Sequence, residues 1–269
     1  SEIKDILFLK NKLSEKIIEN KKTVLKYLLR GWFNDTEETF YKQIYSFPAG
    51  SIGVISKNKL KITKYWNLDS SKKNNFFDKI KFKKKFLENL KIHLRSDVPI
   101  AFTLSGGLDS SSLLGGALSL KYNNYKSFSL LTDKLTDERK EIKELIKVKK
   151  IKHEFCDIKK MYNNNLIQKI ILHNSEPLYS MSFLNQYLLR KFIKKRGFKV
   201  LIVGEGGDEV LAGYKRMFIP YIYYLFKKKN KNIPKKFIYN LENNTGKKIS
   251  FFIEQLKNYQ NRKFVGNDI

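Results

Sequence analysis

The sequence is short of cysteine and of long apolar runs. Its one cysteine, Cys156, allows neither an internal disulfide nor a cysteine-based metal cluster, and this is typical of a reducing cytoplasm, where we expect the protein. The longest apolar stretch, MFIPYIYYLF at 217–226, is about half of the roughly 20 residues that span a bilayer and predicts a buried helix. The N-terminus, SEIKDILFLKNK, lacks the basic-then-apolar order of a signal peptide. We therefore expect a soluble protein without a membrane partner.

Acidic residues are also scarce. The 26 Asp and Glu stand against 54 Lys and Arg, a net charge of +28, which first suggests nucleic acid or an acidic membrane surface as partner. The lysines, however, are dispersed among Asn and Ile, and no stretch interleaves bases with aromatic residues in an RNA-binding motif. We interpret them as solvated faces and do not expect a nucleic-acid partner. Aromatic residues make up 14% of the chain and apolar residues 42%, which excludes a disordered chain.

The patterning of the chain predicts two domains. Residues 3–31 carry helical spacing that ends near Gly31, and β-branched and aromatic residues flank a Lys-Asn turn within 40–68, which predicts a hairpin. The polar segment DSSKKNN at 69–75 is interpreted as a linker. We expect a small α+β domain over 1–72 and a second domain over 73–269.

Beyond the linker, helical and strand patterns alternate. Helices are expected at 76–95, from Asp109, from the caps Thr136 and Asp137 to Lys150, at 159–173, at 182–196 and from 208 onward, and strands at 98–104, 127–132, 152–158 and 199–203. This alternation predicts an α/β fold, a parallel twisted sheet with helices on both faces. In such sheets, ligands bind at the carboxyl ends of strands near a switch in strand order.

The first strand leads into the glycine-rich loop LSGGLDSS, 104–111. Gly106 and Gly107 allow a tight turn and close approach to a ligand, and the backbone N–H groups of the new helix suit an anion. The loop contains neither G-x-x-x-x-G-K-[ST] nor G-x-G-x-x-G. Asp109 would repel a bare phosphate but fits one that carries Mg²⁺. The alternative is a plain turn in which Asp109 or Ser110 caps the helix.

A second acidic, glycine-rich string, VGEGGDEVLAGY at 203–214, follows the last strand. Both loops lie at strand ends, so Asp109 and Asp208 can converge on one cation whose other ligands are phosphate oxygens and water. The alternative, Asp208 and Glu209 as acids at a helix N-terminus, does not explain Gly204-Glu205-Gly206.

These strings resemble the asparagine synthetase family, within the ATP pyrophosphatases, which cleave ATP between its α- and β-phosphates. RSDVPIAFTLSGGLDSSSL at 95–113 and GEGGDEVLAGY carry the resemblance. SFSLL at 127–131 resembles the family's second strand, and SEPLYSMSF at 175–183 resembles a segment near its substrate pocket. FYKQIYSFPAG with KYWNL resembles the end of its glutaminase domain. The resemblance covers roughly residues 25–216.

The resemblance implies that MgATP adenylates aspartate with release of pyrophosphate, and that ammonia, derived from glutamine in a complete homodimeric enzyme, then forms asparagine. It implies Asp109 and Asp208 as metal ligands and catalytic residues, with Glu205 as the base for ammonia. The residues implied to bind ATP are Leu104, Ser105, Gly106, Gly107, Asp109, Ser110, Ser111, Leu130, Val203 and Gly204.

The sequence also departs from the family. The glutamine-hydrolysing N-terminal cysteine is absent, since the chain begins with Ser1 and Cys156 lies in an expected core strand; the family's pyrophosphate-binding lysine region is not found either. We expect a fragment, a truncated gene product or a degenerate relative with little activity of its own. Alternatives are a ligase for another acid, such as a sugar carboxylate or β-lactam precursor, a tRNA-modifying or RNA-binding protein, and a noncatalytic remnant.

Overall fold

The computed structural model describes residues 2–31, 33–67, 78–131, 138–158, 161–163, 165–178, 180–214, 217–218, 221, 238–239, 241–243 and 246–254. The expected linker, the caps Thr136 and Asp137 and most of the apolar stretch at 217–226 lie outside these residues. The chain forms two compact units, one of Ser1–Gly106 with Leu114–Ile202 and one of Gly107–Leu113 with Val203–Ile269.

The first unit begins with two helices, α1 (Ile3–Lys12) and α2 (Lys21–Arg30). The helical spacing of residues 3–31 is thus interrupted between them. The break has a backbone cause. Residues 18–20 pair with 40–42, through Asn20 N–H donating to the Phe40 carbonyl (2.8 Å) and Lys42 N–H to the Ile18 carbonyl (2.8 Å). An extended segment held in this way cannot continue a helix. Gly31 ends α2 at φ 72°, where glycine is favoured, so the predicted end is confirmed.

The predicted hairpin is confirmed as β1 (Ser51–Ser56) and β2 (Lys59–Lys64), paired antiparallel. Its turn residues, Lys57 and Asn58, have φ values of 47° and 61°. Positive φ at both central residues matches the right-handed twist of the flanking strands.

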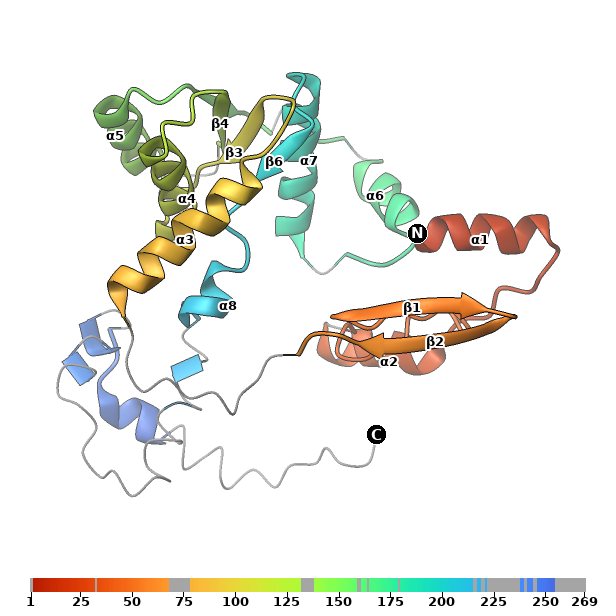
Figure 1. Cartoon of the computed structure of the whole chain (residues 1–269). Helices are drawn as coiled ribbons and strands as arrows, with labels where there is room; N and C mark the ends of the chain where they lie inside the picture. Colours follow the sequence, from red (N-terminus) through yellow and green to blue (C-terminus); the bar gives the residue numbers. More distant parts are fainter. Residues whose placement is uncertain are drawn as a thin grey trace. The chain divides into compact units, whose positions relative to one another are not determined.

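The predicted parallel sheet is present in the first unit, with strand order β5-β4-β3-β6 and every pair parallel (Figure 1). Its strands are β3 (Ile100–Thr103), β4 (Tyr125–Leu130), β5 (His153–Cys156) and β6 (Val200–Ile202). The chain moves outward from β3 to β4 and β5 and then returns to place β6 on the other side of β3. That return is a switch in strand order, and the segments that follow β3 and β6 leave the sheet at the same carboxyl edge.

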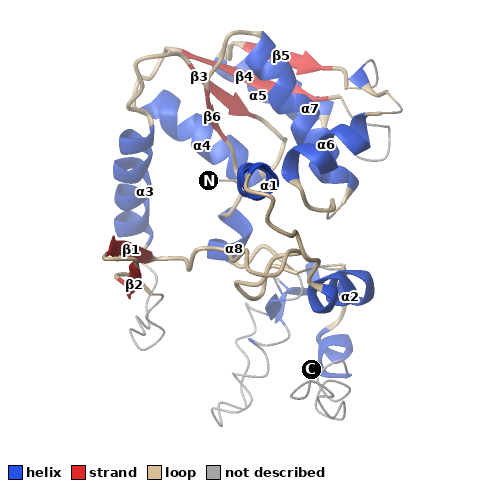
Figure 2. Ribbon diagram, turned by 90° about the vertical axis from the view of Figure 1, so that its right-hand side faces the viewer, coloured by secondary structure: helices blue, strands red, loops and turns tan. Residues whose placement is uncertain are grey.

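Helices cover both faces of the sheet, as predicted (Figures 1 and 2). They are α3 (Lys79–His93), α4 (Leu108–Ser119), α5 (Arg139–Lys149), α6 (Leu166–Asn174) and α7 (Met181–Lys195), and a short α8 (Gly207–Leu211) belongs to the second unit. Ala101 and Phe128 pack on one face in a core cluster with Leu184 and Leu188 of α7. Phe102 points to the other face and packs edge-to-face on Tyr125. Alternate residues of each strand are therefore buried on opposite faces, as in a sheet covered on both sides.

Candidate functional site

The turn that follows β3, residues 104–106, is anchored to the neighbouring strand. The Leu104 N–H donates to the Phe128 carbonyl at 2.8 Å, and the Leu104 carbonyl accepts from the Ser129 hydroxyl. Leu104 is buried, whereas Ser105 is exposed. A Cβ on Gly106 would lie 2.9 Å from Glu141 Cβ, so glycine permits the close approach of this turn to α5.

The start of α4, Gly107–Leu113, belongs to the second unit and holds the serines of the first loop. Ser110 is 5% exposed, and its hydroxyl lies within 3.4 Å of the Gly107 carbonyl. The Ser111 Oγ is buried and has no hydrogen-bond partner among the described residues. A buried hydroxyl without a partner is uncommon in folded proteins, because the lost hydrogen bond to water is not replaced. Ser111 thus presents a donor that a ligand oxygen can satisfy.

The second loop packs its glycines directly on the start of α4. A Cβ on Gly204 would lie 3.0 Å from Ser110 N and 3.3 Å from Asp109 Cβ. A Cβ on Gly207 would lie 2.4 Å from Asp109 Cγ. This is a steric clash, so a larger residue at 207 would displace the Asp109 carboxylate. The structure therefore brings the two glycine-rich loops together, and the glycines at 204 and 207 are the residues that permit it. A helix cap alone does not require either glycine.

The two aspartates lie close along this contact. The Asp109 carboxylate rests against Gly207, which immediately precedes Asp208, and Asp208 in turn packs against Gly213, where a Cβ would collide with its Oδ1. Within the described residues, no hydrogen bond or ion pair joins either carboxylate to another side chain. Nor is any group of three or more His, Cys, Asp or Glu side chains there placed to hold a metal. The predicted site needs only these two carboxylates, because phosphate oxygens and water complete the magnesium shell.

The remaining residues of the second loop are placed differently. Glu205 is exposed, and Gly206 adopts φ 91° before α8 begins. Glu209 accepts a hydrogen bond from the Tyr214 hydroxyl at 2.9 Å. This contact joins α8 to the last residue of the second loop, and the sequence pattern did not predict it. Leu130, the predicted adenine contact, is the last residue of β4 and therefore stands at the carboxyl edge of the sheet.

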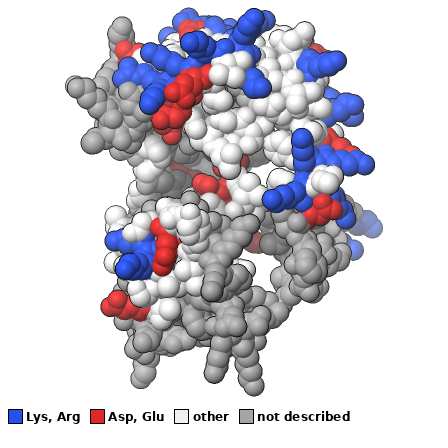
Figure 3. Space-filling model, turned by 90° about the vertical axis from the view of Figure 1, so that its left-hand side faces the viewer, with Lys and Arg blue, Asp and Glu red and all other residues white. Residues whose placement is uncertain are grey.

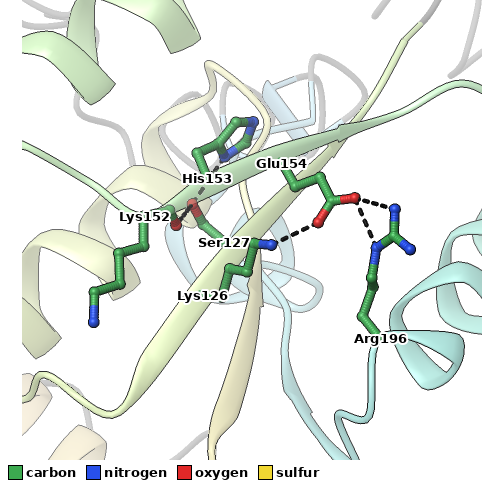
Figure 4. Close-up of polar contacts among 6 residues, drawn as sticks. All are labelled: Lys126, Ser127, Lys152, His153, Glu154 and Arg196. Carbon is green, nitrogen blue, oxygen red and sulfur yellow. Dashed lines mark hydrogen bonds and ion pairs between the residues drawn. The ribbon is translucent and has the colours of Figure 1, made fainter.

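A polar cluster that the sequence did not reveal lies within the sheet (Figure 4). Glu154 accepts from Lys126 Nζ at 2.6 Å and from Arg196 Nε at 2.7 Å, and the hydrogen bond from Arg196 is the main cause that lowers the pKa of Glu154. Ser127 Oγ lies 2.8 Å from His153 Nδ1, and burial lowers the pKa of His153 to about 4. The strand register pairs Ser127 with His153, and Arg196, which follows α7, reaches Glu154 from outside the sheet.

Cys156, the last residue of β5, is fully buried, so its predicted place in the core is confirmed. Burial is the first cause that raises the pKa of its thiol to about 11. A thiol with such a pKa is almost wholly protonated near neutral pH and is a poor nucleophile.

The basic residues do not form one footprint on the face drawn in Figure 3. Lys and Arg side chains lie at several separate places there, with Asp and Glu among them. On this face, the basic side chains are therefore exposed and interspersed with acidic ones. The helices that the structure describes include none with the length and apolar character needed to cross a membrane.

The chain is similar to asparagine synthetases and to a fungal amidase. The family model for asparagine synthase matches residues 81–263. A putative glutamine-hydrolysing asparagine synthetase 2 of Methanocaldococcus jannaschii is 31% identical over 223 residues, covering 80% of this chain and 42% of that protein. The amidase chyE of Penicillium rubens is 26% identical over 198 residues, covering 65% of this chain and 30% of that protein.

Among solved structures, an NH3-dependent NAD synthetase from Campylobacter jejuni, in complex with the nitrate ion, aligns with 69% of this chain and 95% of its own. Its sequence identity is 17% and its TM-score 0.37. The chain spans less than half the length of the two curated relatives above.

Proposed function

The chain belongs to the asparagine synthase family, and we propose that its site serves an ATP-dependent ligase that adenylates aspartate and then amidates it. In this reaction the aspartate side-chain carboxylate attacks the α-phosphate of ATP, and pyrophosphate leaves. Ammonia then attacks the acyl-adenylate, and AMP leaves as asparagine forms. The contact of Gly204 and Gly207 with Asp109 and Ser110 carries this proposal, because it joins the two family-like loops in one place.

We assign ATP to the first loop and its surroundings. The backbone of 104–107 and the first turn of α4 present N–H groups that suit the β- and γ-phosphates. The unpartnered Ser111 hydroxyl adds a donor, with Ser105 and Ser110 beside it in the chain. The family resemblance further assigns Leu130 to the adenine and the backbone of Val203 and Gly204 to ATP binding. These donors, already oriented in the protein, would stabilise the charge that develops on the pyrophosphate as it leaves.

Asp109 and Asp208 would hold Mg²⁺. Both carboxylates lie against glycine backbone at the junction of the loops and have no cationic partner among the described residues. Two negative charges next to a polyphosphate are unfavourable unless a cation lies between them. When bound, the metal supplies that positive charge to the phosphate oxygens.

Glu205 would act as the base of the second step. It lies between two glycines on the loop that contacts Asp109, and its side chain is exposed. As the nitrogen of ammonia bonds to the acyl carbon, that nitrogen gains acidity, and the Glu205 carboxylate can accept its proton. The ammonia would come from glutamine in a longer enzyme of the family.

A second candidate is a ligase of the same type that acts on a different carboxylic acid. The similarity to a protein named amidase favours it, since that relative shares about a quarter of its aligned residues with this chain. The ATP-binding residues do not separate these substrates, because each adenylation uses the same phosphates and metal.

ATP–pyrophosphate exchange on this chain tests the proposal. Labelled pyrophosphate should enter ATP only when aspartate and Mg²⁺ are both present, and the Asp109→Asn variant should lose the exchange. Sugar carboxylates and β-amino acids serve as competing substrates. Exchange that proceeds without any added acid, or better with another acid than with aspartate, would count against aspartate as the substrate.

A further inference from the structure

Two buried serines of β4, Ser127 and Ser129, lie on the same face of the sheet, because alternate residues of a strand point to the same side. Their exposed fractions are 0% and 2%. A buried hydroxyl is unfavourable unless it forms a hydrogen bond, and each of these hydroxyls has its acceptor beside a different neighbouring strand. Ser127 donates to the Lys152 carbonyl, just before β5, at 3.0 Å, whereas Ser129 donates to the Leu104 carbonyl, directly after β3.

The Leu104 carbonyl lies at the point where the chain leaves β3. The pairing of β3 with β4 ends at Thr103 and Phe128, and the next backbone hydrogen bond runs from the Leu104 N–H to the Phe128 carbonyl at 2.8 Å. Leu104 is buried, and a buried carbonyl needs a donor, because it has lost its hydrogen bond to water. The Ser129 hydroxyl is that donor. A side chain of β4 therefore fixes the first peptide group of the glycine-rich loop.

The other end of the turn 104–106 lies against α5. A Cβ on Gly106 would be 2.9 Å from the Glu141 Cβ and 3.5 Å from the Glu138 Cβ. The turn cannot move toward α5 without a steric clash, and the Ser129 hydrogen bond opposes movement of Leu104 away from β4. All of these residues belong to the first unit. The conformation of the turn is thus determined by the two elements that pack beside it.

We propose that Ser129 is a positioning residue for the phosphates of ATP. Its hydroxyl fixes the Leu104 carbonyl and, through it, the backbone of the turn 104–106, whose N–H groups would bind phosphate oxygens. Donors that are already fixed bind an anion more tightly, because little conformational entropy is lost when the ligand arrives. The inference rests on the proposed function, which assigns ATP to this turn, and adds a residue that is too deeply buried to touch the ligand itself.

The variants Ser129→Ala and Ser127→Ala form a matched pair that tests this role. Each removes one buried hydroxyl from the same face of the same strand, but Ser127 contacts the Lys152 carbonyl and His153, on the side away from the loop (Figure 4). Calorimetric titration with MgATP should show an affinity about 3- to 10-fold lower for Ser129→Ala than for the wild type, the range of one hydrogen bond. Ser127→Ala should bind MgATP as the wild type does.

A second ligand separates positioning of the phosphates from a general effect on the fold. AMP lacks the β- and γ-phosphates that are assigned to the turn, so Ser129→Ala should bind AMP as tightly as the wild type does. A general loss of structure would weaken both ligands alike. Ser129→Cys keeps a weak donor of similar size, so its affinity for MgATP should lie between those of the wild type and Ser129→Ala. Melting temperatures are measured on all variants, and the cysteine variant decides the test if Ser129→Ala does not fold.

The outcomes separate this inference from the proposed function. Failure of the wild type to bind MgATP would contradict both. Normal binding by the wild type, with equal affinity in the folded variants at position 129, would contradict the positioning role alone. The same conclusion would follow if Ser129→Ala weakened ATP and AMP equally, or if Ser127→Ala lost as much ATP affinity. A loss confined to ATP and to position 129 would support the role.

Discussion

The acidic residues of the sheet and those of the two glycine-rich loops differ in whether the described chain pairs them with a cation. Within the sheet, Glu154 accepts from both Lys126 and Arg196, so that its charge is matched by the fold itself. At the junction of the two glycine-rich loops, Asp109 and Asp208 lie against glycine backbone and have no such partner among the described residues. Glu154 thus links β5 to β4 and to the residue that follows α7, and we propose that the two aspartates bind a ligand instead.

This difference supports the proposal that the two loop aspartates bind a cation. Bases outnumber acids about two to one, so an acid has many basic residues with which to pair. Glycines at 204, 207 and 213 instead pack against the loop aspartates and the start of α4, and neither aspartate forms an ion pair within the described part of the chain. We infer that the paired glutamate contributes to stability and the unpaired aspartates to binding.

The largest expected effect is on ligand chemistry. Asp109→Asn and Asp208→Asn should each reduce aspartate-dependent ATP–pyrophosphate exchange by about 100-fold or more, because each removes a charge from the magnesium site. Melting temperature should not fall, since neither carboxylate is paired in the described structure. Glu88→Gln is the control. Full exchange activity in Asp208→Asn would show that Asp208 is not a magnesium ligand in this reaction.

A smaller but more specific effect is expected at Gly207. Alanine there would place its Cβ 2.4 Å from Asp109 Cγ and push the carboxylate away, so Mg²⁺-dependent ATP affinity should fall at least about tenfold. Gly115→Ala is the matched control. A Cβ at Gly115 meets nothing within 4 Å, and its place in α4 predicts equal or slightly higher stability. Calorimetric titration of ATP into both variants decides the matter, and equal affinities would contradict the loop packing.

Removing the charge of Glu154 should lower the stability of the protein. Glu154→Gln should lower the free energy of unfolding by about 1 kcal/mol, in the range of a charge network that is partly exposed. The hydrogen bond from Arg196 lowers the pKa of Glu154 from 4.5, so this stabilisation is present above about pH 4.5 and is lost as pH falls through the lowered pKa. Urea unfolding of the wild type and the variant, at pH 7 and at pH 3.5, should show a gap that shrinks in acid. A gap that grows in acid would be inconsistent with the pairing.

The smallest effect concerns Cys156 in the same region. Burial raises the pKa of this thiol to about 11, so iodoacetamide at pH 8 should label the folded chain far more slowly than the urea-unfolded chain. Mass spectrometry over time gives both rates. Equal rates would mean that β5 opens readily and that the sheet is less stable at this edge than its pairing suggests.

Much of this fold could be predicted because its signals are local. The Lys57-Asn58 turn, the helix end at Gly31 and the buried strand around Phe102 are each encoded by residues within a few positions of one another. The same is true of the two glycine-rich loops, whose places at strand ends were predicted and are confirmed. Where a distant segment intervenes, the prediction fails, as at residues 18–20, which pair with 40–42 and interrupt the helical pattern.

Local residue patterns were enough to predict the parallel α/β character of the protein, the two loops and the acids that they carry, because strand and turn preferences depend on neighbouring residues. The packing of Gly207 on Asp109, the hydrogen bonds from Tyr27 and Tyr41 to the turn between α6 and α7, and the place of Glu154 between Lys126 and Arg196 became visible in the folded chain alone. Each of these contacts joins residues far apart in the chain. They depend on strand register and helix packing. The folded chain adopts the register and packing with the lowest free energy of the whole molecule, and a local sequence pattern does not contain that information.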